Sequence, residues 1–375
     1  MKRFFLLILL LFTIYLAKPI WEKPVSQYMD LSFLEPVDNK LKAFLTSEPF
    51  ETAVHFISDQ ADKAILFFLA ETNVQDHEVN NVEKPTLKEP KTSQISIHNL
   101  EIGNAEETVT ATLGEPLQVS HNEYGTNWST YHQDYHNFVM ISYDNERKIN
   151  AIYTNDDLIS SDAGVQYGTS KAVVRERYGE PLTEIRKGLN IYILQDSEGF
   201  DLFKVGDLYA YFFYDLHQDD KVTAIQLVSS SLEHTKNGIY APGNETLRKG
   251  FEIQLFDLTN AARVRHGLPA LKWEENAAQT ALLHSIDMAE HNYFSHENLE
   301  GLSPFDRMRS DGITFRAAGE NLAYGQSSSI FAHEGLMNSK GHRENILQDI
   351  YSHLGIGVAF NEQEQPYYTE NFLLK

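Results

Sequence analysis

An unbroken apolar run near the N-terminus, Phe4 to Ala17, follows the basic residues Lys2 and Arg3. This order of charged and apolar segments is typical of an export signal. A helix of this length covers about 21 Å, which is shorter than the roughly 30 Å hydrocarbon core of a bilayer. A cleavage site needs small residues at −3 and −1, and Tyr15-Leu16-Ala17 supplies only the second. Residues 1–21 therefore predict a signal peptide or, as we favour, an uncleaved membrane anchor.

Two segments of different character follow the N-terminal run. Residues 22–72 contain apolar positions at near-helical spacing, such as Ile65, Phe68 and Leu69, and predict a helical stem. Residues 73–96 are polar and contain two prolines, which is typical of a linker.

The segment 97–235 contains the same pattern twice. Gly103 precedes Leu113-Gly114-Glu115-Pro116, and 65 residues later Gly168 precedes Tyr178-Gly179-Glu180-Pro181. Glycine and proline at these places stop a helix, and alternating apolar residues follow in both copies. The pattern predicts a duplicated module in which each copy has one helix and two or three antiparallel strands.

The last segment, 246–375, has the apolar spacing of helices followed by that of strands. It predicts two long helices, a third helix that begins at a Ser-Pro pair, and a closing hairpin. These elements are, in chain order, Phe251–Val264, Asn276–Glu290, Ser303-Pro304, and Leu354–Phe360 with Tyr367–Leu374. The fold class is therefore α+β.

Charge and composition narrow the classes of partner. The 375 residues include 53 acidic and 31 basic side chains, which gives a formal net charge of −22. Such a field repels phosphate backbones and anionic membrane surfaces, so we expect no nucleic-acid partner and membrane contact only through the N-terminal segment. Cysteine is absent, which excludes disulfides, thiolate nucleophiles and cysteine-ligated zinc.

The last segment contains six ordered motifs. They are Asn260 with Arg263, His284–Met288, Tyr293–His296, Gly319–Ala323, Asn338–Leu347 and Gly355–Gly357. These motifs resemble the bacterial branch of the CAP superfamily, which comprises cysteine-rich secretory proteins, antigen 5 and pathogenesis-related proteins. The duplicated segment resembles the module that accompanies CAP domains in exported bacterial proteins.

The resemblance implies an α-β-α sandwich in an extracellular setting, with a cleft where histidines and acidic residues can hold a divalent metal. Residue by residue, His296 matches the first cleft histidine, Glu320 the glutamate of the Gly-Glu-Asn-Leu motif, and His342 the second histidine. Neutral imidazoles bind zinc, and a nearby carboxylate can ligate or orient them. We therefore expect zinc or another divalent metal as the only cofactor.

One family position is changed in this chain. Many members have a second cleft glutamate three residues after a tryptophan, whereas Leu336 and Ser339 stand there in this sequence. Glu334 or His333, one turn earlier, could substitute for that glutamate, and Glu334 could equally be a solvated helix residue. Ser339 and His284 are further cleft candidates, and His284 is as well explained as a core residue.

Three functions stay open at this point. The first is an exported envelope protein, anchored or secreted, that binds a ligand or a protein partner through the histidine cleft. The second is a metal-dependent hydrolase of peptide or cell-wall bonds, with Glu320 as general base. The chain has no Gly-x-Ser-x-Gly elbow, and Met337 stands where His-Glu-x-x-His needs its second histidine. The third is a non-catalytic scaffold, and no catalytic residue is assigned.

Overall fold

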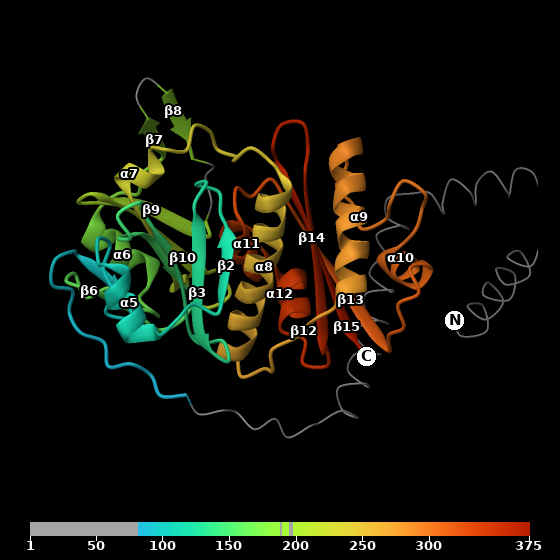
Figure 1. The fold of residues 1–375 in the computed structure, drawn as a ribbon, viewed down its shortest axis with the longest axis horizontal. Helices are drawn as coiled ribbons and strands as arrows, with labels where there is room; N and C mark the ends of the chain where they lie inside the picture. The colour runs from blue at the N-terminus through green and yellow to red at the C-terminus, as the bar shows by residue number, and fades with distance from the viewer. Residues whose placement is uncertain (1–81, 188–189, 195–197) are drawn as a thin grey trace, which may run out of the picture. The chain divides into compact units, whose positions relative to one another are not determined.

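A computed structural model describes residues 82–187, 190–194 and 198–375 (Figure 1). The predicted N-terminal helix, the predicted stem and the first part of the predicted linker lie outside these residues. None of the helices in the described part of the chain is long and apolar enough to cross a membrane.

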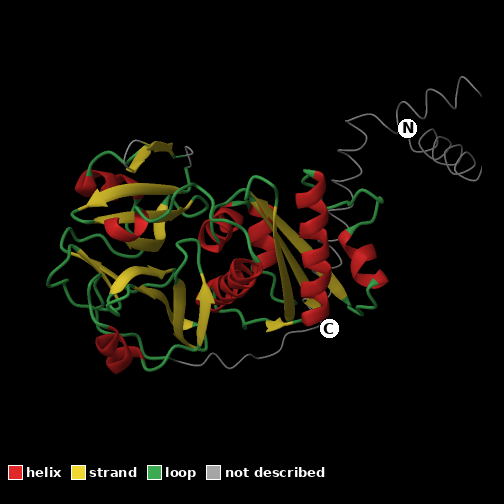
Figure 2. Cartoon of the chain, turned by 45° about the horizontal axis from the view of Figure 1, so that its top comes forward, coloured by secondary structure: helices red, strands yellow, loops and turns green. Residues whose placement is uncertain are grey.

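The N-terminal module is built on a seven-stranded antiparallel sheet (Figure 2). Its strand order is β2-β3-β4-β5-β11-β10-β9. These strands are Gln118–His121 (β2), Asn127–Gln133 (β3), His136–Tyr143 (β4), Ile149–Thr154 (β5), Phe200–Val205 (β9), Leu208–Asp215 (β10) and Lys221–Ser229 (β11). The module also contains a pair of short strands, a hairpin and three helices. These are Ile95–Ile97 (β1) with Ile159–Ser161 (β6), Glu184–Lys187 (β7) with Asn190–Ile193 (β8), and Glu106–Leu113 (α5), Lys171–Tyr178 (α6) and Ser230–Glu233 (α7).

Helices α5 and α6 stop where the two Gly-Glu-Pro motifs predict. Gly114 and Gly179 follow their last residues with φ angles of 80° and 85°, a region that glycine adopts without strain. Gly103 and Gly168 precede the helices, and their amides bond to strands β5 and β11 in the same way, at 2.8 Å in both cases. The same punctuation therefore gives the same local structure in both halves of the module.

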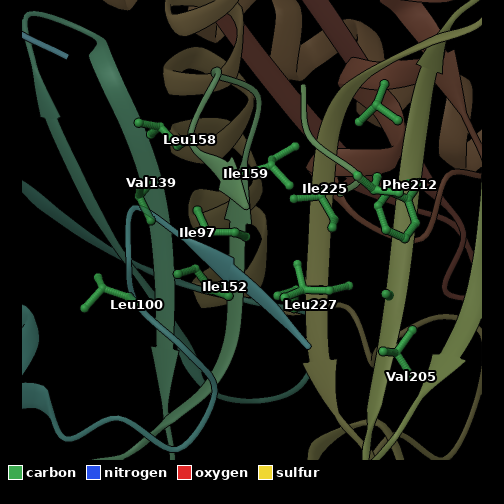
Figure 3. Close-up of a cluster of buried hydrophobic side chains, with 14 of the residues drawn as sticks. Ile97, Leu100, Val139, Ile152, Leu158, Ile159, Val205, Phe212, Ile225 and Leu227 are labelled. Carbon is green, nitrogen blue, oxygen red and sulfur yellow. The ribbon is translucent and has the colours of Figure 1, made fainter. Parts of the chain in front are cut away.

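Both faces of the seven-stranded sheet are buried. One face packs under α5, α6 and the β1–β6 pair, and Figure 3 shows Ile97, Ile159 and Phe212 among the side chains of this core. The other face packs against the C-terminal domain, where the rings of Phe213 and Phe331 meet with centroids 5.3 Å apart. Because the second face is also apolar, side chains of both domains form one hydrophobic cluster between them.

The predicted linker is shorter than its sequence suggests. Strand β1 belongs to the buried core of the module, since Ile95 and Ile97 have no exposed surface. The chain just before it is also held, because the Glu101 carboxylate accepts backbone N–H bonds from residues 91–93. These polar residues therefore form an extended segment that is bound to the module, and they are not a free linker.

The C-terminal domain has a four-stranded sheet of order β12-β14-β15-β13 between helices. The predicted helices and closing hairpin are all present. The elements are Glu245–Arg265 (α8), Lys272–Trp273 (β12), Glu275–His291 (α9), Pro304–Ser310 (α10), Ala317–Tyr324 (β13), Ser329–Asn338 (α11), Lys340–Ile346 (α12), His353–Phe360 (β14) and Pro366–Leu374 (β15).

The two long helices cover opposite faces of this sheet. On one face a Cβ atom at Gly357 would lie 2.0 Å from the backbone of Leu282 in α9, so only glycine allows the helix to pack this closely. On the other face Phe251 of α8 stacks on Tyr368 of β15, with ring centroids 6.0 Å apart. The arrangement is the predicted α-β-α sandwich, and it leaves β13 at the edge of the sheet.

Direct polar contacts join the two domains. Gly250 of α8 lies against strand β2, where a Cβ atom would come within 2.1 Å of the His121 carbonyl oxygen. Gln254 donates to the same oxygen at 2.7 Å, and Arg343 of α12 pairs with Asp215 of β10 at 2.8 Å. The module therefore packs directly against helices α8 and α12 of the C-terminal domain.

Candidate functional site

The structure brings His296 and Glu320 together, as the motifs predict. His296 donates from Nδ1 to Oε1 of Glu320 at 2.8 Å, and Arg307 donates to the other carboxylate oxygen at 2.6 Å. The Glu320 side chain is 2% exposed, whereas the His296 side chain is 53% exposed. A buried, charge-paired carboxylate therefore fixes one nitrogen of a half-exposed ring.

Local sequence places each of these groups at the same edge of the sheet. Asn292, the residue that follows α9, adopts a left-handed conformation and turns the chain into the loop that carries His296. Helix α10 begins with a capping box between Ser303 and Asp306, and this helix presents Arg307. Arg307 also donates to the backbone oxygen of His296 at 2.7 Å and so holds the loop as well as the carboxylate.

His342 lies on α12, which packs against edge strand β13. The side chain of Asn321, next to Glu320 on β13, donates to the His342 backbone oxygen at 3.1 Å and so ties α12 to the strand. Burial, together with the nearby His296 ring, lowers the pKa of His342. We call His296, Arg307, Glu320 and His342 the histidine site.

His284 supports the loop rather than joining the histidine site. It is 2% exposed, and its Nε2 atom donates to the backbone oxygen of Ser295 at 2.9 Å. Burial lowers its pKa, so the ring is neutral at physiological pH. Of the two interpretations of this residue, the core one describes its surroundings.

Glu334 and Ser339 lie at the junction with the module. Glu334 is buried, and Tyr153 of β5 donates to its carboxylate at 2.6 Å. Both residues line a cavity of about 990 Å³ between the domains, together with rings such as Phe200 and Phe331. Glu334 therefore contacts the module and makes no hydrogen bond to His296 or His342.

The residues of the histidine site offer few free ligand atoms to a metal ion. In the described part of the chain no group of three or more histidine, aspartate or glutamate side chains is arranged to hold a metal ion. Both oxygens of Glu320 are already hydrogen-bonded, one of them to the cationic Arg307. The residues fit a site in which two imidazoles bind and the carboxylate orients one of them. They do not fit a zinc site with three or four protein ligands.

Sequence reasoning missed Arg307 as a member of the site. The pattern around it indicates only the first turn of a helix, and that indication is confirmed by α10. Nothing in the local sequence shows that the guanidinium points to a glutamate 13 residues further along the chain. A buried carboxylate next to only neutral histidines would have been a signal that a cation was missing.

Two family models match the chain in its two domains. The model described as CAP-associated N-terminal matches residues 102–239. The model of the cysteine-rich secretory protein family matches residues 256–372.

Relatives and solved structures agree with these matches. A Bacillus subtilis protein named uncharacterized membrane protein YlbC is 30% identical over 291 residues, which cover 72% of this chain and 82% of the relative. An extracellular protein with an SCP domain from Bacillus anthracis matches 78% of this chain and all of its own, with 29% identity and a TM-score of 0.65. A cysteine-rich secretory protein from Staphylococcus aureus matches 76% of this chain and 98% of its own, with 18% identity and a TM-score of 0.57.

Proposed function

Because the chain belongs to the cysteine-rich secretory protein family and carries the CAP-associated N-terminal domain, we propose that it is an exported envelope protein that binds a ligand at the histidine site. The relative named a membrane protein and the extracellular neighbour support a place on the outer side of the cell membrane. The predicted apolar segment at residues 1–21 would direct the chain there as an anchor or as a signal peptide.

One observation carries the choice of site. The Nδ1 atom of His296 is hydrogen-bonded to a buried glutamate that Arg307 neutralises, while about half of the His296 side chain is exposed. This fixes the proton on Nδ1 and leaves Nε2 with a free lone pair. A buried carboxylate that orients an exposed imidazole is typical of a histidine that binds a ligand through its other nitrogen.

A divalent metal such as zinc is the first candidate ligand. His296 would bind it through Nε2, His342 would supply the second imidazole, and Glu320 would keep His296 in the required tautomer. Since these residues supply only two ligands, the other coordination positions would be filled by water or by an envelope ligand. A bound zinc ion would act there as a Lewis acid that attracts anionic or carbonyl oxygens.

Binding is favoured over hydrolysis by the contacts of the site. No hydroxyl group in the described residues is hydrogen-bonded to the ring of His296 or His342, so neither imidazole is paired with a nucleophile. Glu320 has both oxygens engaged and would lose its bond to Arg307 if it acted as a general base. We therefore do not propose an enzymatic reaction.

Calorimetric titration of the full chain in detergent with Zn²⁺ tests the proposal. We expect about one zinc per chain at micromolar concentration, and at least a tenfold loss of affinity in the double variant His296→Ala with His342→Ala. His291→Ala is the matched control, because that histidine is exposed at the end of α9 and its only ion pair among the described residues is with Asp287. Zinc binding that survives the double variant, or is lost in the control, would contradict the proposed site.

A further inference from the structure

A second concave site lies between the module and the C-terminal domain and shares no residue with the histidine site. It is a groove of about 660 Å³ in which strand β2 and the β3–β4 turn face helices α8 and α9. Its walls are mostly apolar and include Ile253, Phe256, Trp273 and Leu282. The rings of Phe256 and Trp273 meet edge to face, with centroids 5.3 Å apart. We call this the α8 groove.

Asp257 is the unusual member of the lining. Its side chain is on α8 and only 7% exposed, and its Oδ1 atom accepts a hydrogen bond from the Tyr135 hydroxyl at 3.2 Å. Its Oδ2 atom is buried and has no hydrogen-bond partner within the described structure. No lysine, arginine or histidine of the described residues lies within ion-pair distance of this carboxyl group. Burial without a compensating cation raises the pKa of Asp257 to about 7, and a perturbed acid that lines a groove is a candidate for a functional site.

The other charges of the groove are already balanced or exposed. Arg248 forms ion pairs with Glu245 at 2.6 Å and with Glu252 at 2.5 Å. Lys249 pairs with the same Glu245 at 3.2 Å. The lining histidine, His132, is neutral, since burial lowers its pKa to about 4. None of these groups is therefore free to neutralise Asp257.

The β3–β4 turn holds the acceptor in place. Asp134 and Tyr135 have φ angles of 48° and 66°, a left-handed conformation that is uncommon for a bulky residue such as tyrosine. The Tyr135 ring stacks on His132 with centroids 4.2 Å apart, and its hydroxyl reaches Asp257. A strained turn that is fixed by packing and aims one hydroxyl at a buried acid is typical of a preorganised binding site.

We propose that the α8 groove binds a small organic amine, with its apolar body against the edge-to-face pair of Phe256 and Trp273 and its protonated amino group at Asp257. The amine supplies both the positive charge and the N–H donors that the carboxylate lacks. The aromatic walls favour a cation as well as an apolar body. The groove has the volume of a typical small-molecule site, and the net charge of −22 favours the approach of cations.

The test uses two probes of equal shape, 2-phenylethylamine and 2-phenylethanol, which differ in the charged group. Binding to the full chain in detergent is measured through tryptophan fluorescence and calorimetry, since Trp273 lines the groove. We expect the amine to bind at least tenfold more tightly than the alcohol. The Asp257→Asn variant should reduce the affinity for the amine to that for the alcohol. Glu290→Gln is the matched control, because Glu290 is an exposed acid of α9 that does not line the groove, and it should change the amine affinity less than twofold.

A second variant locates the probe independently of Asp257. Gln279 is an exposed lining residue, so Gln279→Trp fills the groove without touching the core, and it should weaken both probes. Equal affinity for amine and alcohol, or no amine binding at millimolar concentration, would overturn the proposal. Amine preference that persists in Asp257→Asn, or amine binding that is unchanged in Gln279→Trp, would overturn it as well.

Discussion

Glu334 at the domain junction gives a prediction about stability that can be worked out in numbers. Burial raises its pKa from 4.5 to about 7, although the Tyr153 hydroxyl and the nearby Arg265 act in the opposite direction. The folded state therefore prefers the protonated acid. The stabilisation is complete below the unfolded pKa of about 4.5, decreases as the pH rises through 4.5 to 7, and is lost above about 7.

The magnitude follows from the size of that rise. Each pKa unit corresponds to about 1.4 kcal/mol, so the ionised carboxylate costs the folded state about 3 kcal/mol relative to the protonated one. Glu334→Gln removes the ionisation and keeps an oxygen that can accept the bond from Tyr153. Relative to the natural protein, the variant should therefore gain about 3 kcal/mol of unfolding free energy between pH 4.5 and pH 7.5.

Denaturant unfolding of both proteins, followed by circular dichroism at several pH values, measures this difference. Comparing the two proteins at each pH cancels the titration of all other groups. Glu290→Gln, at an exposed position of α9, is the control and should show no such trend. A difference between Glu334→Gln and the natural protein that stays constant from pH 4.5 to pH 7.5 would refute the reasoning about the junction.

Two further predictions concern the frame of the histidine site. Gly357→Ala should lower the free energy of unfolding by about 3 kcal/mol or more, because the new Cβ atom would lie 2.0 Å from the Leu282 backbone. Gly341→Ala has free space and should instead raise the free energy of unfolding by about 0.5–1 kcal/mol through α12. The thermal unfolding midpoints of the two variants should therefore shift in opposite directions. Ser303→Ala removes the side-chain half of the α10 capping box with Asp306 and should cost about 1 kcal/mol by denaturant unfolding. An unchanged midpoint in Ser303→Ala would show that the capping box does not stabilise this helix.

Local patterns predicted the elements of the fold well. The glycines that end α5 and α6, the Ser-Pro start of α10 and the closing hairpin act through their own backbone neighbours, so the sequence near them contains the relevant information. The linker was predicted less well. Whether a polar segment is free depends on distant acceptors such as Glu101, which composition does not show.

The site could be predicted only where residues belong to motifs. His296 and Glu320 are 24 positions apart and meet as the family resemblance implies. The partner of Glu334 is Tyr153, which is 181 positions away in another domain, and no local pattern encodes that contact. Asp257 was not noticed at all, because on a helix with other buried positions an aspartate gives no sign that its partner cation is absent.

The most direct test of the histidine site is NMR of the full chain labelled with ¹⁵N-histidine, with His296→Ala and His342→Ala variants to assign the two rings. We predict that His296 carries its proton on Nδ1, because that atom donates to Glu320, and that Glu320→Gln weakens this preference. Added Zn²⁺ should shift the Nε2 resonance of His296 and one nitrogen of His342 together. If His296 instead carries its proton on Nε2, or if zinc shifts other histidines and leaves these two unchanged, the proposed binding site is wrong.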